Sequence, residues 1–599
     1  MRHLERLRLA IALTTLAVAA PVAAQLGLDL APDQKTKEQP RSPDAAGKRS
    51  APRPATAPAP QAPVTMPELD VAAGKGDAGK RLAEANKVFA AGDDQTAALA
   101  YDAILRDPTL AEVHDEARYQ LAKSLARLDL NHAALDKLDE ILSKGPQGTK
   151  YYTNALEWLF HVARKTVNDS IIVSAVARHA GGALPPSQQD HYTYLLARYS
   201  YERGRALEQL GQVAEAKRSY AEARRLASLV RQEAGAHPAP RRGELGGDDG
   251  DVYARARFLE GLVQYSEGQG QAALESFKDV VRLTNPRRGR VPDRRLREQA
   301  FLQLARIHYE HKQNRYAIFY YDRMPWGGDS WLEGLWESSY AHYRIGDYEK
   351  ALGNLLTLQS PYFRDEWFPE SWILKAIIYY ENCRYPEALA ILDEFHQNHE
   401  GVYRELERLT GSQTQPAAFY DLIEDVQKHR AARGQLMRRI LKVAFTDRTL
   451  ERLNGSILEV ERETEVLGSR SSGLRDAFRS SALARDLRDR LQRERRRLVE
   501  EAGARARAKL EYERDALRDL LQQALRIKIE VARNQREALE AQLGGGARAE
   551  ALRDYRYSVA VSDEHLYWPY DGEFWRDELG TYTYTLTKGC RDTGARAFR

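Results

Sequence analysis

Two carboxylates beside aromatic side chains come closest, in this 599-residue chain, to the residue types and spacing of a catalytic pair. Glu573 and Glu578 lie in the segment 567–580, which reads YWPYDGEFWRDELG. Paired carboxylates can cleave glycosidic bonds, one acting as an acid and the other as a base or nucleophile. The signal is weak, because carboxylates in a short aromatic segment are far more often structural or exposed to water. We therefore interpret Glu573 and Glu578 as non-catalytic.

Residues suited to metal or nucleotide chemistry are present, but they lack the required spacing. No His-Glu-x-x-His run or Cys-His cluster accompanies the histidines that fall on or near predicted helices. The glycine-rich stretch 243–250 lacks the Gly-Lys-Ser/Thr of a phosphate-binding loop. We expect no metal, no cofactor and no enzymatic activity. The histidines in question are His308, His311, His342, His396 and His399.

Cysteine usage is sparse, with only Cys383 and Cys590 in the chain. Two cysteines exclude a disulfide-dense scaffold and an all-cysteine zinc site. Cys383 is expected at a hairpin turn and Cys590 just after the last predicted strand. In an oxidising compartment a bridge between them would join the C-terminal tail to the repeats. Two free thiols remain the alternative, because a bridge needs a Cα separation of roughly 4.4–6.8 Å that the sequence cannot establish.

The N-terminus has the pattern of a secretory signal peptide. Basic residues at positions 2, 6 and 8 precede the apolar run 9–20, and small residues follow up to Ala24. We expect residues 1–24 to be removed by cleavage near Ala24, which places the protein in the periplasm. An uncleaved membrane anchor is the weaker alternative, because the apolar run is short for a bilayer. The proline-rich residues 25–78 are expected to form a disordered linker.

Overall charge argues against a nucleic-acid partner. The 90 basic residues are nearly matched by 86 acidic ones, so the formal net charge is only +4. A dedicated nucleic-acid binder would show a one-sided basic excess. We expect contact with a membrane only through other proteins.

Residues 79–400 repeat a helical pattern with small residues where helices cross. In one unit, Phe301, Ala305, Tyr309, Ala317 and Tyr321 follow the spacing of the tetratricopeptide (TPR) repeat, which they resemble. The next two units place Ala351 and Ala388 at spacings of 34 and 37 residues from the preceding alanine. Each such hairpin leaves an apolar face that only the next hairpin can cover, so the units must stack. Hairpins of another solenoid type are the alternative, and both interpretations give an α-solenoid. Looser copies include Phe89, Ala97, Ala122, Ala134, Gly204, Ala216, Gly261 and Ala273.

Residues 401–546 predict longer helices and then a charged arm. Helices are expected at about 417–444 and 449–466, followed by a proline-free stretch at about 474–543. Its leucines form a narrow stripe that Glu494, Glu501 and Arg505 interrupt near the expected seam. The pattern favours a coiled coil or an antiparallel hairpin over a regular parallel zipper. The fold class is therefore all-α, a TPR-like solenoid followed by a long helical arm.

Residues 547–599 are expected to add a small aromatic-rich β tail. Alternation around residues 557–561 and 582–586 predicts two short strands. The segment between the two strands, residues 567–580, contains many aromatic side chains, which must pack on the helices or on a partner because exposing them to water is costly. We expect the tail to be a docking element. The partner-binding candidates are Trp568, Tyr570, Phe574, Trp575 and Arg576 in the tail, and Trp331, Trp336 and Tyr343 in the repeats.

The aromatic segment with its Arg-Asp-Glu-Leu-Gly run, behind TPR-like repeats, resembles exported TPR proteins of deltaproteobacteria, in particular those of adventurous gliding motility. The resemblance implies a periplasmic envelope scaffold without catalytic residues. From the repeats themselves we expect the concave side of the superhelix to bind envelope proteins or their extended segments, and the arm to reach either a second component or a copy of itself. An adaptor for cell-wall or outer-membrane assembly is the alternative. A peptidoglycan-cleaving enzyme is the third class. Similarity to lytic transglycosylases would require a lysozyme-like domain where the charged arm stands.

Overall fold

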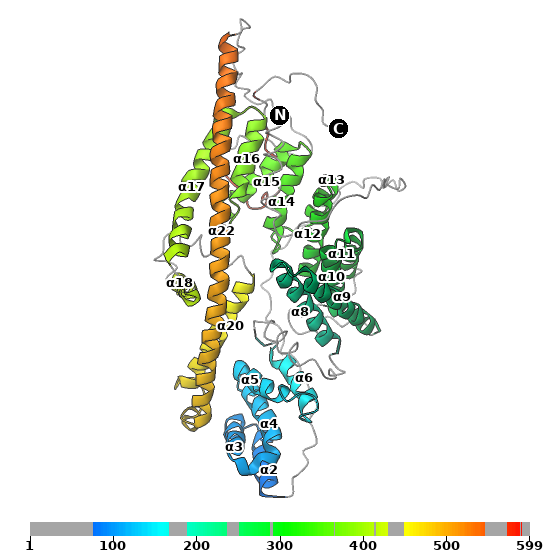
Figure 1. Cartoon of the computed structure of the whole chain (residues 1–599), viewed down its shortest axis with the longest axis vertical. Helices are drawn as coiled ribbons and strands as arrows, with labels where there is room; N and C mark the ends of the chain where they lie inside the picture. Colours follow the sequence, from blue (N-terminus) through cyan, green and yellow to red (C-terminus); the bar gives the residue numbers. More distant parts are fainter. Residues whose placement is uncertain are drawn as a thin grey trace, which may run out of the picture. The chain divides into compact units, whose positions relative to one another are not determined.

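The computed structural model describes residues 76–163, 165–166, 189–236, 251–287, 292–363, 366–412, 415–428, 448–544, 572–586 and 589. The chain divides into two compact units, Met1–Ala83 and Glu84–Arg599, and the contacts discussed below lie within the second. Every regular element in the described ranges is a helix, as Figure 1 shows. The all-α prediction is confirmed for these ranges. Among them, no helix combines the length and apolar character needed to cross a bilayer.

Most of the helices before residue 412 occur as hairpins. The pairs are α2 (Asp77–Ala90) with α3 (Asp94–Arg106), α4 (His114–Arg127) with α5 (Asn131–Leu142), α8 (Gln189–Gln209) with α9 (Val213–Ala236), α10 (Val252–Ser266) with α11 (Gly270–Leu283), α12 (Arg294–Glu310) with α13 (Asn314–Tyr321), α14 (Trp331–Arg344) with α15 (Tyr348–Leu358), and α16 (Glu370–Glu381) with α17 (Tyr385–Ser412). Helix α6 (Tyr152–Ala163) and the short 3-10 helices η1 (Pro108–Val113) and η3 (Pro361–Phe363) complete this part.

The same turn closes each of these hairpins. The middle turn residue has a positive φ in every one, and the third donates its N–H to a carbonyl five residues back, as Gln313 does to His308 at 2.9 Å. This is the left-handed helix ending that glycine adopts most easily. Glycine occupies the position in four hairpins, while Asp129, Lys312 and Cys383 adopt it at φ values of 57°, 61° and 57°.

Side-chain sizes repeat in register with that turn. In the α12–α13 hairpin, Ala305 lies seven residues before the turn residue Lys312, Ala317 five after it and Tyr321 nine after it. All three are buried in one cluster with Phe301. Corresponding positions of the other hairpins also hold a small residue, an alanine and a large apolar residue. The alanines are Ala97, Ala134, Ala216, Ala273, Ala317, Ala351 and Ala388, and each is at most 2% exposed. The sequence prediction of TPR-like hairpins is thus confirmed.

Ala317→Trp is expected to destabilise the repeats by roughly 1–3 kcal/mol or more, because the larger side chain overpacks a helix crossing with no free space. A chemical-denaturation curve measures the effect. Tyr316→Trp is the matched control, because Tyr316 lies on the same helix and is 54% exposed. Equal stability of the two variants would show that Ala317 is not at a packed crossing.

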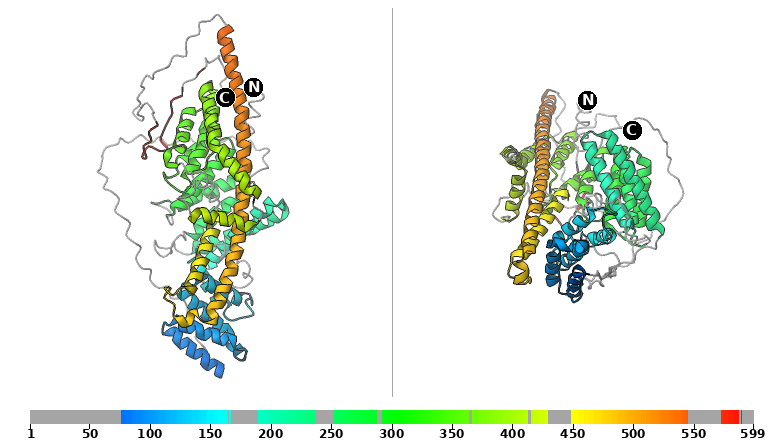
Figure 2. Two further views of the ribbon diagram at one scale, coloured as in Figure 1. Left: turned by 90° about the vertical axis from the view of Figure 1, so that its left-hand side faces the viewer. Right: turned by 60° about the horizontal axis from the view of Figure 1, so that its bottom comes forward.

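The arm consists of helices that pack along one another. Helices α18 (Pro416–Lys428) and α20 (Arg448–Gly468) precede the short α21 (Asp476–Arg479) and the continuous α22 (Ala482–Gly544). At 1.5 Å per residue, α22 is about 95 Å long. Helices α17, α18 and α20 each pack against α22, and Figure 2 shows them beside it in further views. The predicted long stretch does not fold back on itself but forms the continuous helix α22, along which α20 packs. Helix α17 joins the repeats to the arm across residue 400.

One face of α22 forms the seam with these helices. Buried residues recur along it from Leu487 to Val531, with Ala502 and Ala506 in the middle. Glu501 and Arg505, next to these alanines, are exposed, so the expected interruption of the seam does not occur. Small side chains let α18 approach closely at this level, where Gly503 faces the backbone of Pro416.

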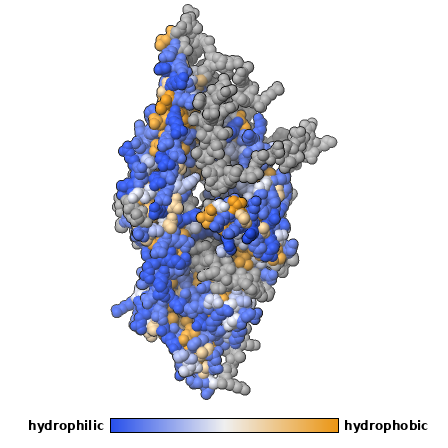
Figure 3. All heavy atoms as spheres, viewed as in Figure 1, coloured by the Kyte–Doolittle hydropathy of each residue, from blue (hydrophilic) through white to orange (hydrophobic). Residues whose placement is uncertain are grey.

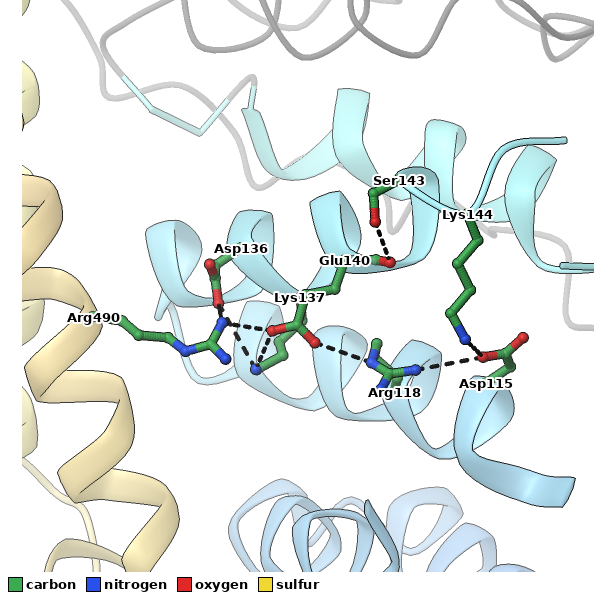
Figure 4. Close-up of polar contacts among 8 residues, drawn as sticks. All are labelled: Asp115, Arg118, Asp136, Lys137, Glu140, Ser143, Lys144 and Arg490. Atoms are coloured by element: carbon green, nitrogen blue, oxygen red, sulfur yellow. Dashed lines mark hydrogen bonds and ion pairs between the residues drawn. The ribbon is translucent and has the colours of Figure 1, made fainter. Parts of the chain in front are cut away.

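Ionic contacts join the arm to the second repeat hairpin. In Figure 4, Arg490 of α22 reaches both Asp136 and Glu140 of α5. Glu140 also accepts from Arg118 of α4 at 3.0 Å and from Lys137 at 2.7 Å. Burial raises the pKa of Glu140, but these cations outweigh it and the net pKa is lowered. The carboxylate thus stays ionised as the centre of a network between the two parts.

A buried carboxylate of α20 caps the start of α5. Glu463 accepts from the backbone N–H groups of His132, at 2.8 Å, and Ala133, at 3.3 Å. The first N–H groups of a helix have no partner within it, so the carboxylate satisfies them. Burial raises the pKa of Glu463 to about 7. Burial lowers the pKa of His132, but its hydrogen bond to Glu459 and the nearby carboxylates raise the net value.

Both shifts predict that stability falls as pH rises. A group whose pKa is higher in the folded state binds extra protons on folding, so its contribution is lost as pH rises through the folded pKa. For Glu463 that window runs from about 4.5 to about 7, and for His132 it begins at 6.5. We expect the free energy of unfolding to fall between pH 5 and pH 8 by on the order of 1–3 kcal/mol, which a lower melting temperature reports. Glu463→Gln should flatten this dependence, and an unchanged slope would contradict the assignment.

Candidate protein-interaction site

The C-terminal tail lies on the last repeat hairpins. Residues 572–586 and 589 contact α14, α15 and the turn between α16 and α17. We call the solenoid residues that hold it the tail-binding surface. They are Trp326, Trp331, Glu349, Lys350, Gly353, Thr357 and Asn382.

Apolar side chains anchor the tail. Leu579 is 1% exposed and Tyr582 is 6% exposed, and both form one cluster with Trp331 of α14. The Trp331 ring lies 5.7 Å from the Trp326 ring and 6.0 Å from that of Phe363, measured between centroids. Full burial of a leucine-sized side chain contributes about 1.5–3 kcal/mol. Two such anchors therefore hold the tail on the repeats.

Hydrogen bonds from the repeats go mainly to the tail backbone. Trp326 Nε1 donates to the Leu579 carbonyl at 3.0 Å, and Lys350 Nζ donates to the carbonyls of Gly580, at 3.0 Å, and Tyr582, at 3.3 Å. The Gly580 N–H donates to Thr357 Oγ1 at 3.0 Å. Further along, the N–H of Tyr584 donates to the Glu349 carbonyl at 2.9 Å. These bonds reach main-chain groups of the turn at residues 576–581 and of the extended residues 582–586 that follow it.

Two glycines permit the close approach. A Cβ on Gly353 of α15 would overlap the Tyr582 carbonyl, so only glycine lets the tail lie this close to the helix. Gly580 has a φ of +90°, and its Cβ would meet the Trp331 ring at 2.7 Å. The tail and its surface are therefore matched through one position on each side that lacks a side chain.

Burial shifts several pKa values in this region. Burial lowers the pKa of Lys350, although Asp322 and Asp347 oppose the shift. Burial and the hydroxyl of Tyr584 raise the pKa of Tyr379 well above its ordinary value, which pairs a repeat tyrosine with a tail tyrosine. These groups act as hydrogen-bonding partners of the tail.

The predicted strand at residues 582–586 is wrong. Tyr582 to Leu586 alternate between more and less buried side chains, as an extended chain does, but the described residues include no partner strand. Their backbone instead bonds helix α15, and the Leu586 N–H donates to Glu349 Oε1 at 3.2 Å. The period-two pattern indicates an extended conformation correctly and a β-sheet incorrectly. The other predicted strand, 557–561, lies outside the described residues.

The predicted binding residues divide into three groups. Trp331 contacts the tail directly, and Phe574 packs against Tyr582 at 6.4 Å between ring centroids. Trp575 is 47% exposed and Arg576 is exposed, so these two side chains remain accessible at the site. The remaining candidates do not contact the described tail residues in this way: Trp336 packs on Tyr340 and Phe368, Tyr343 donates to Glu381, and Trp568 and Tyr570 lie outside the described residues.

Other residues of the surface were missed by sequence reasoning. Glu349, Lys350 and Thr357 form a row along α15, and Trp326 precedes α14. Their role depends on contacts more than 220 residues away in the chain, as for Gly580 and Thr357. Gly353 offered a signal, because a glycine inside a helix costs about 1 kcal/mol relative to alanine and often has a packing reason.

Cys383 lies beside the end of the tail. It is disulfide-bonded, and it occupies the positive-φ position of the α16–α17 turn. The Gly589 N–H donates to the neighbouring Asn382 carbonyl at 2.8 Å. Cys590, the other cysteine of the chain, lies outside the described residues, so its pairing with Cys383 stays a prediction.

Glu578 and two of the histidines first considered for chemistry have packing or surface roles. Glu578 is exposed and accepts from Thr581 Oγ1 at 2.9 Å. His399 stacks on Phe395 at 4.6 Å, and His342 bonds Asp347 at 2.9 Å. Across the described ranges, no three His, Cys, Asp or Glu residues are grouped so that they could hold a metal ion.

Comparisons with known proteins add little to this picture. No protein-family model matches the chain, and no curated protein matches it. Among solved structures, the TPR domain of P58(IPK) is similar at 14% identity, over 70% of this chain and 98% of that one, with a TM-score of 0.17. The TPR-like assignment therefore rests on the hairpin geometry and the repeated buried residues.

Proposed function

We propose that the protein is a non-enzymatic scaffold whose TPR-like hairpins bind extended protein segments. The observation that supports this most is the tail itself, whose main chain is held by Trp326, Lys350 and Thr357. Burial of Leu579 against Trp331 adds an apolar anchor of the kind that dominates binding energy at interfaces. The tail is then a built-in ligand, and a partner segment of similar chemistry competes with it.

The scaffold is proposed to work in the periplasm as part of a cell-envelope complex, of which gliding-motility machinery is one example. The signal-peptide pattern of residues 1–24 supports export. The disulfide bond at Cys383 supports an oxidising compartment, because structural disulfides are rare in the cytosol. An adaptor in cell-wall or outer-membrane assembly would use the same surface.

Export is tested by Leu13→Arg combined with Leu16→Arg, which breaks the apolar run. We expect the variant to stay in the cytoplasmic fraction and to retain its full N-terminus, because the charges prevent recognition as a signal peptide. Val64→Arg with Met66→Arg, in the proline-rich linker well beyond the predicted cleavage site, is the control that should still be exported. Unchanged fractionation of the first variant would contradict the periplasmic assignment.

The scaffold and enzyme classes are separated by paired variants. Trp331→Ala should impair both tail docking and cellular function, because it removes the ring on which Leu579 packs. Glu573→Gln and Glu578→Gln should leave function nearly intact. Cleavage of peptidoglycan by the purified protein, abolished by either glutamine, would replace the scaffold proposal with the enzyme alternative.

A further inference from the structure

The C-terminal third of α22 carries an exposed apolar stripe. Leu525, Ile529, Leu539 and Leu543 are 52%, 64%, 51% and 88% exposed. Together with the exposed Ala532 and Arg536 they follow alternating spacings of four and three residues, which is the pattern of a coiled-coil seam. Figure 3 shows hydrophobic residues among hydrophilic ones along the upper part of α22. We call these six residues the arm stripe.

The arm stripe is distinct from the seam that holds α22 to the rest of the chain. Ala524, Ile527 and Val531, on the other side of the helix, are at most 1% exposed. At the same level Lys528 pairs with Asp393 of α17, and Tyr380 of α16 donates to Glu530 at 3.3 Å. The helix is thus fixed along one face, while a second face, turned away from the first, has a seam that none of the other described residues covers.

The charges and sizes of the side chains in and beside the arm stripe favour a second copy of the helix in antiparallel orientation as its partner. In a parallel pair of two copies, each Arg536 would face its counterpart within the seam, a like-charge contact that is unfavourable. In an antiparallel pair, Arg536 faces the small Ala532, while Leu525 faces Leu543 and Ile529 faces Leu539. The same register brings Arg526 of each copy beside Glu540 of the other, which gives two attractive contacts. It also brings the two Arg533 side chains together, but each of them pairs with Glu537 of its own helix at 2.9 Å, so the attractive contacts dominate. Glu540 already pairs with Arg536 of its own helix at 3.3 Å, so the three groups would form a network.

We propose that two copies of this chain associate antiparallel through the arm stripe. The inference deepens the proposed scaffold function, on which it rests, by naming a second copy as the partner of the arm. From Leu525 to Leu543 the stripe is about 27 Å long, at 1.5 Å per residue. Such a dimer brings two tail-binding surfaces into one assembly, which strengthens attachment to a partner with two binding segments.

Sedimentation velocity of the full-length chain over a range of concentrations tests the proposal. We expect a monomer–dimer equilibrium whose Kd rises at least tenfold with Ile529→Arg, because the charge enters the middle of the stripe. Tyr512→Arg is the matched control, since Tyr512 is an exposed apolar residue of the same helix outside the stripe, and it should leave the Kd unchanged. A chain that stays monomeric up to about 100 µM, or a dimer indifferent to Ile529→Arg, would overturn the proposal.

Orientation is tested by exchanging the flanking charges. Arg526→Glu alone should weaken the antiparallel dimer, and adding Glu540→Arg should restore it. In a parallel pair these residues do not face each other, so lack of restoration would overturn the antiparallel register. Binding of a peptide of residues 572–589 is measured in chains that also carry Leu579→Asp and Tyr582→Asp, which remove the tail's own anchors from the tail-binding surface. A chain that binds the peptide but stays monomeric without any substitution in the arm stripe refutes only self-association, whereas absence of peptide binding refutes the scaffold function.

Discussion

Gly353→Ala is expected to release the C-terminal tail while the repeats stay folded. The added methyl group would overlap the carbonyl of Tyr582, which is backbone and cannot rotate away. Alanine is a better helix former than glycine by about 1 kcal/mol, so helix α15 itself should gain stability. Undocking exposes Leu579 and Tyr582. In the unmodified chain, a partner segment must replace the free energy of burying these two side chains before it can displace the tail.

Hydrogen exchange at the tail amides measures this release. The N–H groups of Gly580, Tyr584 and Leu586 donate to the repeats, so their protection should disappear in Gly353→Ala. Gly401→Ala is the matched control, because Gly401 lies inside α17 with open space around the added methyl group. Protection equal to that of the unmodified chain in Gly353→Ala would show that the tail does not lie on α15.

Gly503→Ala is expected to open the contact between α18 and α22. The new methyl group would overlap the Pro416 carbonyl at the start of α18, and overpacking of this kind costs roughly 1–3 kcal/mol. The better helix propensity of alanine offsets about 1 kcal/mol of that cost. The net result should be a lower melting temperature and faster proteolysis of the α18 region.

Gly411→Ala supplies the control for this second substitution. Gly411 lies in the last turn of α17, and a methyl group there would meet nothing within 4 Å. It should therefore leave both proteolysis and melting close to those of the unmodified chain. If Gly503→Ala behaves in the same way, α18 does not cross α22 at this glycine.

The repeats could be predicted from the sequence because their determinants are local. Ala317, Ala351 and Ala388 each lie five residues after a turn that the same hairpin supplies, so spacing alone reveals them. Helix propensity and the leucine stripe likewise predicted α22. The turn position of Cys383 was predicted correctly, whereas Lys312 was less visible, because non-glycine residues rarely adopt a positive φ.

Long-range packing could not be predicted. Glu463 caps α5 from 331 residues away, and nothing near Glu463 in the sequence indicates this partner. The alternation at residues 582–586 predicts a strand because an extended chain has the same period whether it pairs with a strand or with a helix. Trp336 illustrates a different error. Trp331 and Trp336 lie on the same helix and were both predicted to bind a partner, but the Trp336 ring packs on Tyr340.

Peptide titration tests the central claim, that the last hairpins bind an extended protein segment. A synthetic peptide of residues 572–589 is titrated by calorimetry into the full-length chain carrying Leu579→Asp and Tyr582→Asp, which frees the tail-binding surface. We predict saturable one-to-one binding to this variant, and no binding when Gly353→Ala is added. Absence of binding to the first variant, or equal binding to both, would contradict the account.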